Sequence, residues 1–170
     1  MIALCNLLSD GIPFKTYDPS LDAIIETVLT TSRVFVAIAA RSLASIETDV
    51  TLPQFRLLIV LAAHGPQTLG SLAELLTVNA STAMRMCDRL IRKGLIRRRT
   101  SPSNRREVRL ALTEKGRVLV DHATKQRRIE LSRLLESVPK DEQRHLIRAL
   151  TYINVAAGEV PDQDWASGWQ

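Results

Sequence analysis

The chain has 170 residues, of which 45% are apolar and 24% charged, and its net charge is +5. These are ordinary values for a soluble globular protein, and the length allows one well-buried domain or a smaller domain with an oligomerisation element. Two cysteines exclude a disulfide framework, and we find neither the basic flank of a signal peptide nor the roughly 18 apolar residues of a membrane helix. We therefore predict a cytoplasmic protein with no membrane partner.

The first predicted element is a long helix. Residues 1–18 form an N-terminal extension to which we assign no structure, and Asp18 with Pro19 is typical of an N-cap followed by a first helical residue. Apolar residues then recur every three to four positions, which predicts an amphipathic helix over residues 19–50. At about 1.5 Å per residue it is roughly 45 Å long. A small domain cannot cover such a stripe, so we expect part of it to meet a second subunit.

Three helices follow at short intervals. The first begins at Thr51–Pro53 and stops at Gly65, and Thr68 caps a short second one. A turn of two residues separates this second helix from a third that begins at Asn79. Two helices joined by so short a turn are the layout of a helix-turn-helix.

The helix from Asn79 to Gly94 has two faces. Asn79 is a good N-cap, and Gly94 can take the left-handed conformation that ends many helices. By helical spacing the apolar face contains Ala83, Met86 or Cys87, Leu90 and Ile91. The polar, mostly cationic face contains Ser81, Thr82, Arg85, Asp88, Arg89 and Arg92. We predict that one face packs while the other touches an anion, and that Asp88 pairs with Arg92 one turn later.

A β-hairpin is predicted next. Residues 95–100 begin like a strand, and Val108, Leu110 and Leu112 alternate with other residues at a period of two. The loop between them, 101–106, is rich in turn formers. From residue 81 to 109 the chain has ten basic and two acidic side chains, so this segment carries +8 and the rest carries −3. A winged helix with a polyanionic partner is the prediction.

Two further helices close the pattern. Thr113 caps the first, in which we interpret the charged run Lys125–Arg128 as a solvated turn. Pro139 begins the second, which ends near Gly158. The tail, 159–170, is acidic and contains Trp165 and Trp169, for which docking and mobility both stay open.

The ordered set of motifs resembles the MarR family of bacterial transcriptional regulators over roughly residues 19–158. These motifs are Leu52-Pro53-Gln54-Phe55-x-Leu57-Leu58, Leu72-Ala73-x-x-Leu76, Ser81-Thr82-x-x-Arg85-x-x-Asp88-Arg89-Leu90-x-x-Lys93-Gly94-Leu95-Ile96 and Leu112-Thr113-x-x-Gly116. The resemblance implies a mostly α fold with a small β-hairpin wing. A winged helix-turn-helix DNA-binding domain (51–112) is flanked by long dimerisation helices (19–50 and 113–158). It also implies a homodimer that binds palindromic operator DNA, usually as a repressor. A small phenolic or aromatic effector, or oxidation, would release the dimer from the DNA.

Within this frame we predict the side chains that touch DNA. Those expected at base edges are Ser81, Thr82 and Arg85. Those expected at phosphates are Arg89, Arg92 and Lys93. The family's wing tip carries an Asp-x-Arg motif, and Asn104 replaces its aspartate here while Arg106 is retained for the minor groove. The complete predicted set is Asn79, Ser81, Thr82, Arg85, Arg89, Arg92, Lys93, Arg99, Asn104, Arg105 and Arg106.

Other functions fit the residues less well. A winged helix that binds proteins has no use for the arginine-tipped loop. A thiol-based redox regulator would rely on Cys5, which lies well before the first helix, whereas we predict Cys87 to be an inert core thiol. We find no Ser/His/Asp set, paired carboxylates, glycine-rich phosphate loop or HExxH motif, so we expect no enzyme. The spacing of the three histidines suggests no metal site, and we expect no cofactor.

Overall fold

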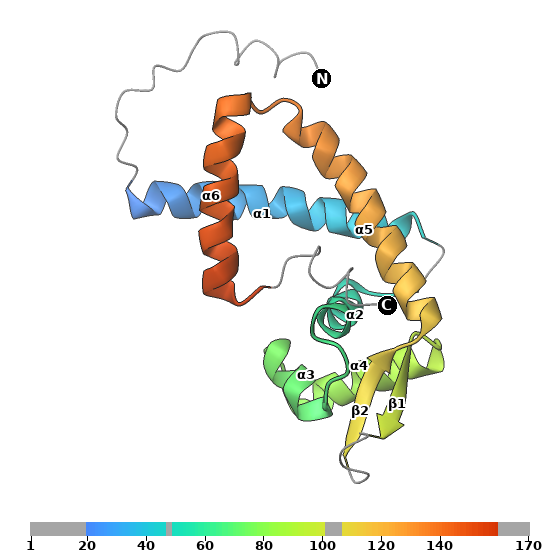
Figure 1. Ribbon diagram of the computed structural model, residues 1–170. Coiled ribbons are helices and arrows are strands. Elements are labelled where there is room, and N and C mark those ends of the chain that lie inside the picture. Colours follow the sequence, from blue (N-terminus) through green and yellow to red (C-terminus); the bar gives the residue numbers. More distant parts are fainter. Residues whose placement is uncertain (1–19, 47–48, 101–106, 160–170) are drawn as a thin grey trace. The chain divides into compact units, whose positions relative to one another are not determined.

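The computed structural model describes residues 20–46, 49–100 and 107–159 (Figure 1). Its elements are α1 (Leu21–Ala44), α2 (Leu52–His64), α3 (Leu69–Leu75), α4 (Ala80–Arg92), β1 (Ile96–Thr100), β2 (Val108–Leu112), α5 (Glu114–Leu135) and α6 (Lys140–Ala157). The predicted class, mostly α with a small β-hairpin wing, is confirmed. The chain divides into two compact units, with the boundary between Val36 and Ala37.

The first unit is described from Ser20 to Val36 and consists of the first part of α1. Ser20 Oγ accepts a hydrogen bond from the N–H of Ala23 (3.3 Å) and caps the helix, whereas the predicted cap at Asp18 lies outside the described residues. Large apolar side chains of this segment are 39 to 71% exposed, namely Leu21, Ile24, Ile25, Val28, Leu29, Val34, Phe35 and Val36. An exposed apolar surface of this extent indicates an interaction site.

Helix α1 is also long and apolar enough to cross a membrane, judged by length and composition alone. This corrects our expectation that no stretch of the chain reaches that limit. Hydroxyl residues interrupt the apolar run, but Thr27 and Thr31 donate to the carbonyls of Ala23 and Thr27 at 2.8 and 2.9 Å, which satisfies their polarity within the helix. The apolar helix of a soluble protein passes the same test.

The second unit begins with the last turns of α1. Ile38, Ser42 and Leu43 are buried there, and the guanidinium of Arg41 binds Glu130 of α5 at 2.6 and 2.9 Å. The helix ends at Ala44, earlier than the predicted residue 50.

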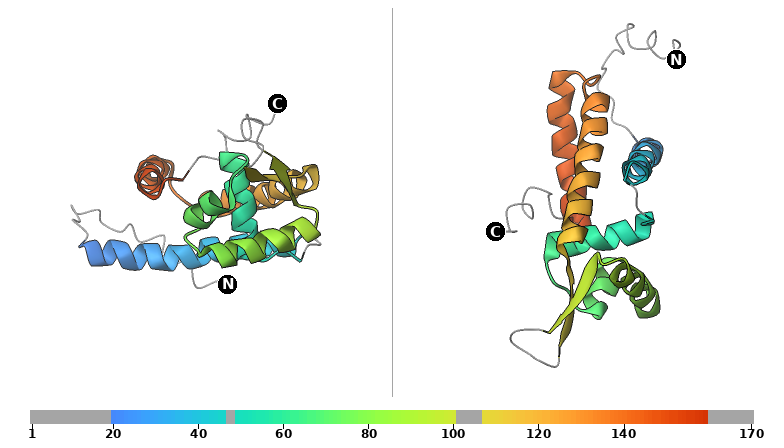
Figure 2. Two further views of the ribbon diagram at one scale, coloured as in Figure 1. Left: turned by 90° about the horizontal axis from the view of Figure 1, so that it is seen from below. Right: turned by 90° about the vertical axis from the view of Figure 1, so that its right-hand side faces the viewer.

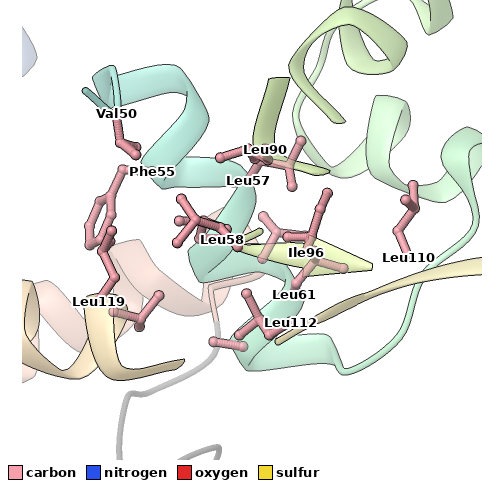
Figure 3. Close-up of a cluster of buried hydrophobic side chains, with 14 of the residues drawn as sticks. Val50, Phe55, Leu57, Leu58, Leu61, Leu90, Ile96, Leu110, Leu112 and Leu119 are labelled. Carbon is pink, nitrogen blue, oxygen red and sulfur yellow. The ribbon is translucent and has the colours of Figure 1, made fainter. Parts of the chain in front are cut away.

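Helix α2 is the centre of the hydrophobic core in this unit (Figure 3). Leu57 and Leu58 of α2 are fully buried. The same cluster includes Leu90 of α4, Ile96 of β1, Leu112 of β2 and Leu119 of α5. Removing one such leucine side chain costs about 2–5 kcal/mol, so α2 is what holds α4 and the hairpin in place.

The predicted hairpin is confirmed. Strands β1 and β2 are antiparallel, with Ile96 opposite Leu112 and Thr100 opposite Val108, and α5 follows β2 almost at once (Figure 2). Gln67, before α3, exchanges backbone hydrogen bonds of 3.0 and 2.7 Å with Leu110 of β2. The hairpin is thereby tied to the helix-turn-helix.

The motif Leu112-Thr113-x-x-Gly116 joins α5 to the end of α4. Thr113 Oγ1 accepts from the N–H of Gly116 (3.1 Å) and donates to the carbonyl of Gly94 (2.7 Å). A Cβ on Gly116 would lie 2.1 Å from the Leu95 carbonyl oxygen. Only glycine therefore allows the first turn of α5 to approach this backbone so closely.

Helix α5 runs unbroken from Glu114 to Leu135, and the charged run Lys125–Arg128 lies in its middle, with Lys125 and Arg128 exposed, as a solvated turn of the helix. Lysine, glutamine and arginine are good helix formers, and a charged run can lie along a helix without interrupting its backbone. Helix α6 follows Pro139, as predicted, and ends at Ala157, where Gly158 with φ +66° caps it. None of its residues is buried.

Candidate nucleic-acid interface

A short turn joins α3 to α4, and hydrogen bonds hold both helix starts. Thr68 Oγ1 accepts from the N–H of Ser71 at 3.2 Å, and Asn79 Oδ1 accepts from the N–H of Thr82 at 2.8 Å, so both predicted caps are confirmed. Between the helices Thr77 has φ +55°, a costly conformation for a β-branched residue. The structure thus contains the predicted helix-turn-helix.

The two faces of α4 are as the helical spacing predicts. Ala83, Cys87 and Leu90 are buried against the core. The exposed side chains on the other side include Ser81, Arg85, Arg89 and Arg92. Because the apolar face is packed, the arginines form a cationic surface on a fixed support.

Four predicted residues at the start of α4 form one hydrogen-bonded group. Asn79 Oδ1, besides capping the helix, accepts from Ser81 Oγ at 2.8 Å. Thr82 Oγ1 accepts from Arg85 Nη2 at 3.0 Å. These contacts restrict the rotamers of the side chains before any ligand arrives, which lowers the entropic cost of binding.

Asp88 does not pair with Arg92, as we expected, but with Arg98 of β1. Arg98 Nη2 donates to Asp88 Oδ1 at 3.0 Å, and both side chains are about half exposed. Helical spacing identified the neighbour one turn away, but the strand that packs beside α4 supplies a closer one. Arg98 was not in the predicted set. The period of two in a strand places its side chain on the opposite side of β1 from those of Arg97 and Arg99, and this alternation is the signal that could have identified it.

Lys93 is held apart from this row of arginines. Its ammonium group contacts the backbone carbonyl of Asp49 and lies 3.3 Å from Asp49 Oδ2. Its own carbonyl accepts from Lys115 Nζ at 3.1 Å. The structure therefore brings Lys93 together with the segment before α2 and with α5.

The wing is described only along its strands. Arg97 and Arg99 of β1 are exposed, and Arg99 lies opposite Arg109 in the hairpin. The predicted tip residues Asn104, Arg105 and Arg106 lie outside the described residues. Their contact with DNA stays a prediction.

The thiol and metal predictions concern side chains other than those of the exposed face of α4. Cys87 is buried, and burial, with a smaller effect of Asp88, raises the pKa of its thiol to about 11. An inert core thiol is therefore the right description of Cys87, whereas Cys5 lies outside the described residues. Over residues 20–46, 49–100 and 107–159 there is no group of three or more His, Cys, Asp or Glu side chains that could hold a metal ion.

Comparison with known proteins decides the family. The sequence model of the MarR family matches residues 50–108. The HTH-type transcriptional repressor MdtR of Bacillus subtilis is 30% identical over 115 residues, which are 67% of this chain and 74% of MdtR. The chain belongs to the MarR family. As in other MarR-family members, the function is that of a DNA-binding transcriptional regulator, and the names of the relatives point away from an enzyme.

Solved structures agree with the MarR fold. The crystal structure of RV1404 from Mycobacterium tuberculosis is 43% identical and superposes with a TM-score of 0.77, covering 86% of this chain and 99% of that one. A point mutant of MepR from S. aureus, bound to an oligodeoxyribonucleotide, is 22% identical with a TM-score of 0.56, covering 82% and 99% of the two chains. The latter likeness shows the fold alone.

Proposed function

We propose that this MarR-family protein is a cytoplasmic homodimeric repressor of palindromic operator DNA, with one α4 in each of two major grooves. The observation that supports this most is the start of α4, where Asn79, Thr82 and Arg85 are linked by hydrogen bonds on a cationic face. In helix-turn-helix proteins the first residues of the second helix contact base edges. The repressor function of MdtR and the DNA-bound form of MepR support the same proposal.

Each predicted residue then has a role. Ser81, Thr82 and Arg85 read bases, and Arg85 can pair bidentately with guanine. The residues that meet phosphates without reading sequence are Asn79, Arg89, Arg92 and Arg99, whereas Lys93, predicted to be a fifth, binds Asp49 instead. Asn104, Arg105 and Arg106 enter the minor groove next to the half-site.

The dimer is proposed from exposed apolar surface. The first unit leaves the apolar stripe of α1 open, and α6 buries no residue in the chain by itself. Burial of such surface drives association. A two-fold axis would set the half-sites about one helical turn apart.

Operator binding tests these roles. Footprinting upstream of the protein's own gene should protect a palindrome, and the affinity should fall steeply with salt because phosphate contacts release counterions. Arg85→Ala should cost about 1–3 kcal/mol on the operator and much less on other DNA, whereas Arg89→Ala should weaken both alike. A loss with Arg85→Ala that is equal for all sequences would contradict base reading. A weak salt dependence would favour a protein-interaction module.

The effector site is proposed in a cavity of about 600 Å³ beside the end of α4. Its polar lining includes Lys93, Lys115 and His122, and its apolar lining includes Leu95 and Val118. Volumes of about 300–1,000 Å³ are typical of small-molecule sites, and cations above apolar walls suit a small aromatic acid. Such an acid competes with Asp49 for Lys93, so it favours a different position of the α4 end and weakens DNA binding.

Salicylate is a suitable probe for this site. We expect it to bind by isothermal titration calorimetry and to lower operator affinity, and we expect Lys115→Met to weaken both effects. Lys125→Met, an exposed lysine of the same helix, is the matched control. Salicylate binding that Lys115→Met leaves unchanged would place the effector elsewhere.

A further inference from the structure

The hairpin of β1 and β2 has two sides. Arg98 donates to Asp88 of α4 at 3.0 Å, so its side of β1 points towards that helix, which lies beside the hairpin (Figure 1). Because side chains alternate along a strand, those of Arg97 and Arg99 lie on the other side. Arg109 is directly opposite Arg99 in β2 and shares this side with it. We call the side with Arg97, Arg99 and Arg109 the outer face of the hairpin.

The outer face is cationic. Arg97 and Arg99 are exposed, and no carboxylate in the described part of the chain forms an ion pair with either of them. Arg109 Nε donates to Glu107 Oε1 at 2.5 Å, yet the side chain of Arg109 is still 43% exposed. Three arginines and one glutamate leave a net charge of +2 on this small surface.

This arrangement costs stability in the free protein. Side chains directly opposite each other in a hairpin have Cβ atoms about 4.5–5.5 Å apart, and like charges in such a pair are destabilising. Arg99 and Arg109 form such a pair, which the single carboxylate of Glu107 neutralises only in part. An anion bound to both guanidinium groups would remove the repulsion, and the planar fork of arginine suits phosphate oxygens. The outer face therefore favours a partner with several phosphates.

The place of the outer face on DNA rests on the proposed function, in which α4 occupies a major groove. The inner side of the hairpin then points to that groove, and the outer face points away from it along the duplex. Two half-sites one helical turn apart have a single minor groove between them, about 6 Å wide. Two hairpins do not fit into it together. Each hairpin must therefore lie beyond its half-site, with its outer face towards the flanking DNA.

We propose that Arg97, Arg99 and Arg109 bind phosphates of the DNA that flanks the palindrome. The hairpin then holds the backbone outside the half-site while α4 reads the half-site itself. Phosphate contacts carry no sequence information, so they lengthen the bound site without changing the sequence that is recognised. Arg97 and Arg109, which were not in the predicted set, thereby become DNA-binding residues.

Duplexes of two lengths test the outer face. The short one ends at the edges of the palindrome found by footprinting, and the long one has a further helical turn, about 10 base pairs, at each end. Arg97→Gln removes one phosphate contact per subunit, so on the long duplex it should weaken binding several-fold. The slope of log affinity against log salt should become shallower by about 1.8, which is about 0.9 for each of two contacts. Neither quantity should change on the short duplex.

Two further variants sharpen this test. Glu107→Gln removes the carboxylate that competes for Arg109, so it should tighten binding to the long duplex and leave the short one as it is. Arg133→Gln, which makes the same charge change as Arg97→Gln at an exposed position of α5, should affect neither duplex. Replacing the flanking sequence by another should preserve all these results, because phosphates are alike in every sequence.

Two outcomes would overturn the inference. Equal losses with Arg97→Gln on both duplexes would place this arginine inside the half-site. No loss on either duplex would show that DNA is not the partner of the outer face, and an acidic protein surface would then fit it better. Arg85→Ala, measured on the same duplexes, separates this failure from that of the proposed function. If Arg85→Ala still weakens binding to both lengths, α4 reads the operator even though the outer face does not bind its flanks.

Discussion

Helices α4 and α6 are both amphipathic, yet they use their apolar faces in opposite ways. Helix α4 buries Ala83, Cys87 and Leu90 within the chain and exposes arginines. Helix α6 buries none of its 18 residues, and Ile147 and Ile153 are 66 and 50% exposed. The first helix has its packing partner in the same chain, whereas the described part of the chain buries no residue of the second.

This difference shows how far a helical pattern can be interpreted. Periodicity indicates that one face has a partner, but it does not say which molecule supplies it. For α4 the partner is the core around α2, which leaves the cationic face exposed. For α6 an unsatisfied apolar face leads to the proposal of a second copy.

The largest expected effect is on α6. Ile147→Asp combined with Ile153→Asp should separate the dimer, because burying one isoleucine contributes about 1.5–3 kcal/mol and a dimer contains four of these residues. The dimer Kd, measured by analytical ultracentrifugation, should rise by several powers of ten. Arg148→Asp, on the opposite side of α6, should leave it nearly unchanged. A wild-type chain that is monomeric at micromolar concentration would contradict this prediction.

The next effect concerns the buried face of α4. Leu90→Ala should lower the free energy of unfolding by about 2–5 kcal/mol because it empties a fully buried site. Urea denaturation followed by circular dichroism measures it, and the loss should not depend on protein concentration. Leu150→Ala on α6, made as the matched variant, should show a loss that does depend on concentration. Equal behaviour of the two variants would remove the distinction between these helices.

A smaller effect is expected at the start of α4. Asn79→Ala should cost about 0.5–2 kcal/mol of stability, since it leaves the N–H of Thr82 without its cap, and it should lower operator affinity because Ser81 loses its acceptor. Asn79→Ser keeps a capping oxygen and should restore most of the stability. A stability of Asn79→Ala equal to that of the wild type would show that the cap is dispensable.

The smallest effect is expected at the Asp88–Arg98 pair. Asp88→Asn should change stability by less than about 1 kcal/mol, because an exposed ion pair contributes little. It frees Arg98 for a phosphate, so the slope of log affinity against log salt should steepen by about 0.9. Asp141→Asn, which makes the same charge change on α6, should leave the slope as it is. An unchanged slope in both variants would show that Arg98 does not face DNA.

Local signals in the sequence predicted many of the helix starts and the β-hairpin. The caps at Thr68, Asn79 and Thr113 are formed between residues three positions apart, so the pattern alone is enough to place them. The same holds for the hairpin, whose alternation shows in β2. The pairing of Asp88 misled us, because helical spacing points to Arg92 and contains no information about the strand that supplies Arg98.

The sequence by itself determined which side of α4 packs and which side is cationic, because the period of 3.6 residues sorts side chains without reference to other elements. Only the tertiary structure decided that Asp88 pairs with Arg98, that Lys93 binds Asp49, and that none of the residues of α6 is buried by the described part of the chain. The physical reason is that these contacts join residues of different elements. Their distances depend on which helix or strand packs opposite, and the spacing along one helix contains no information about that.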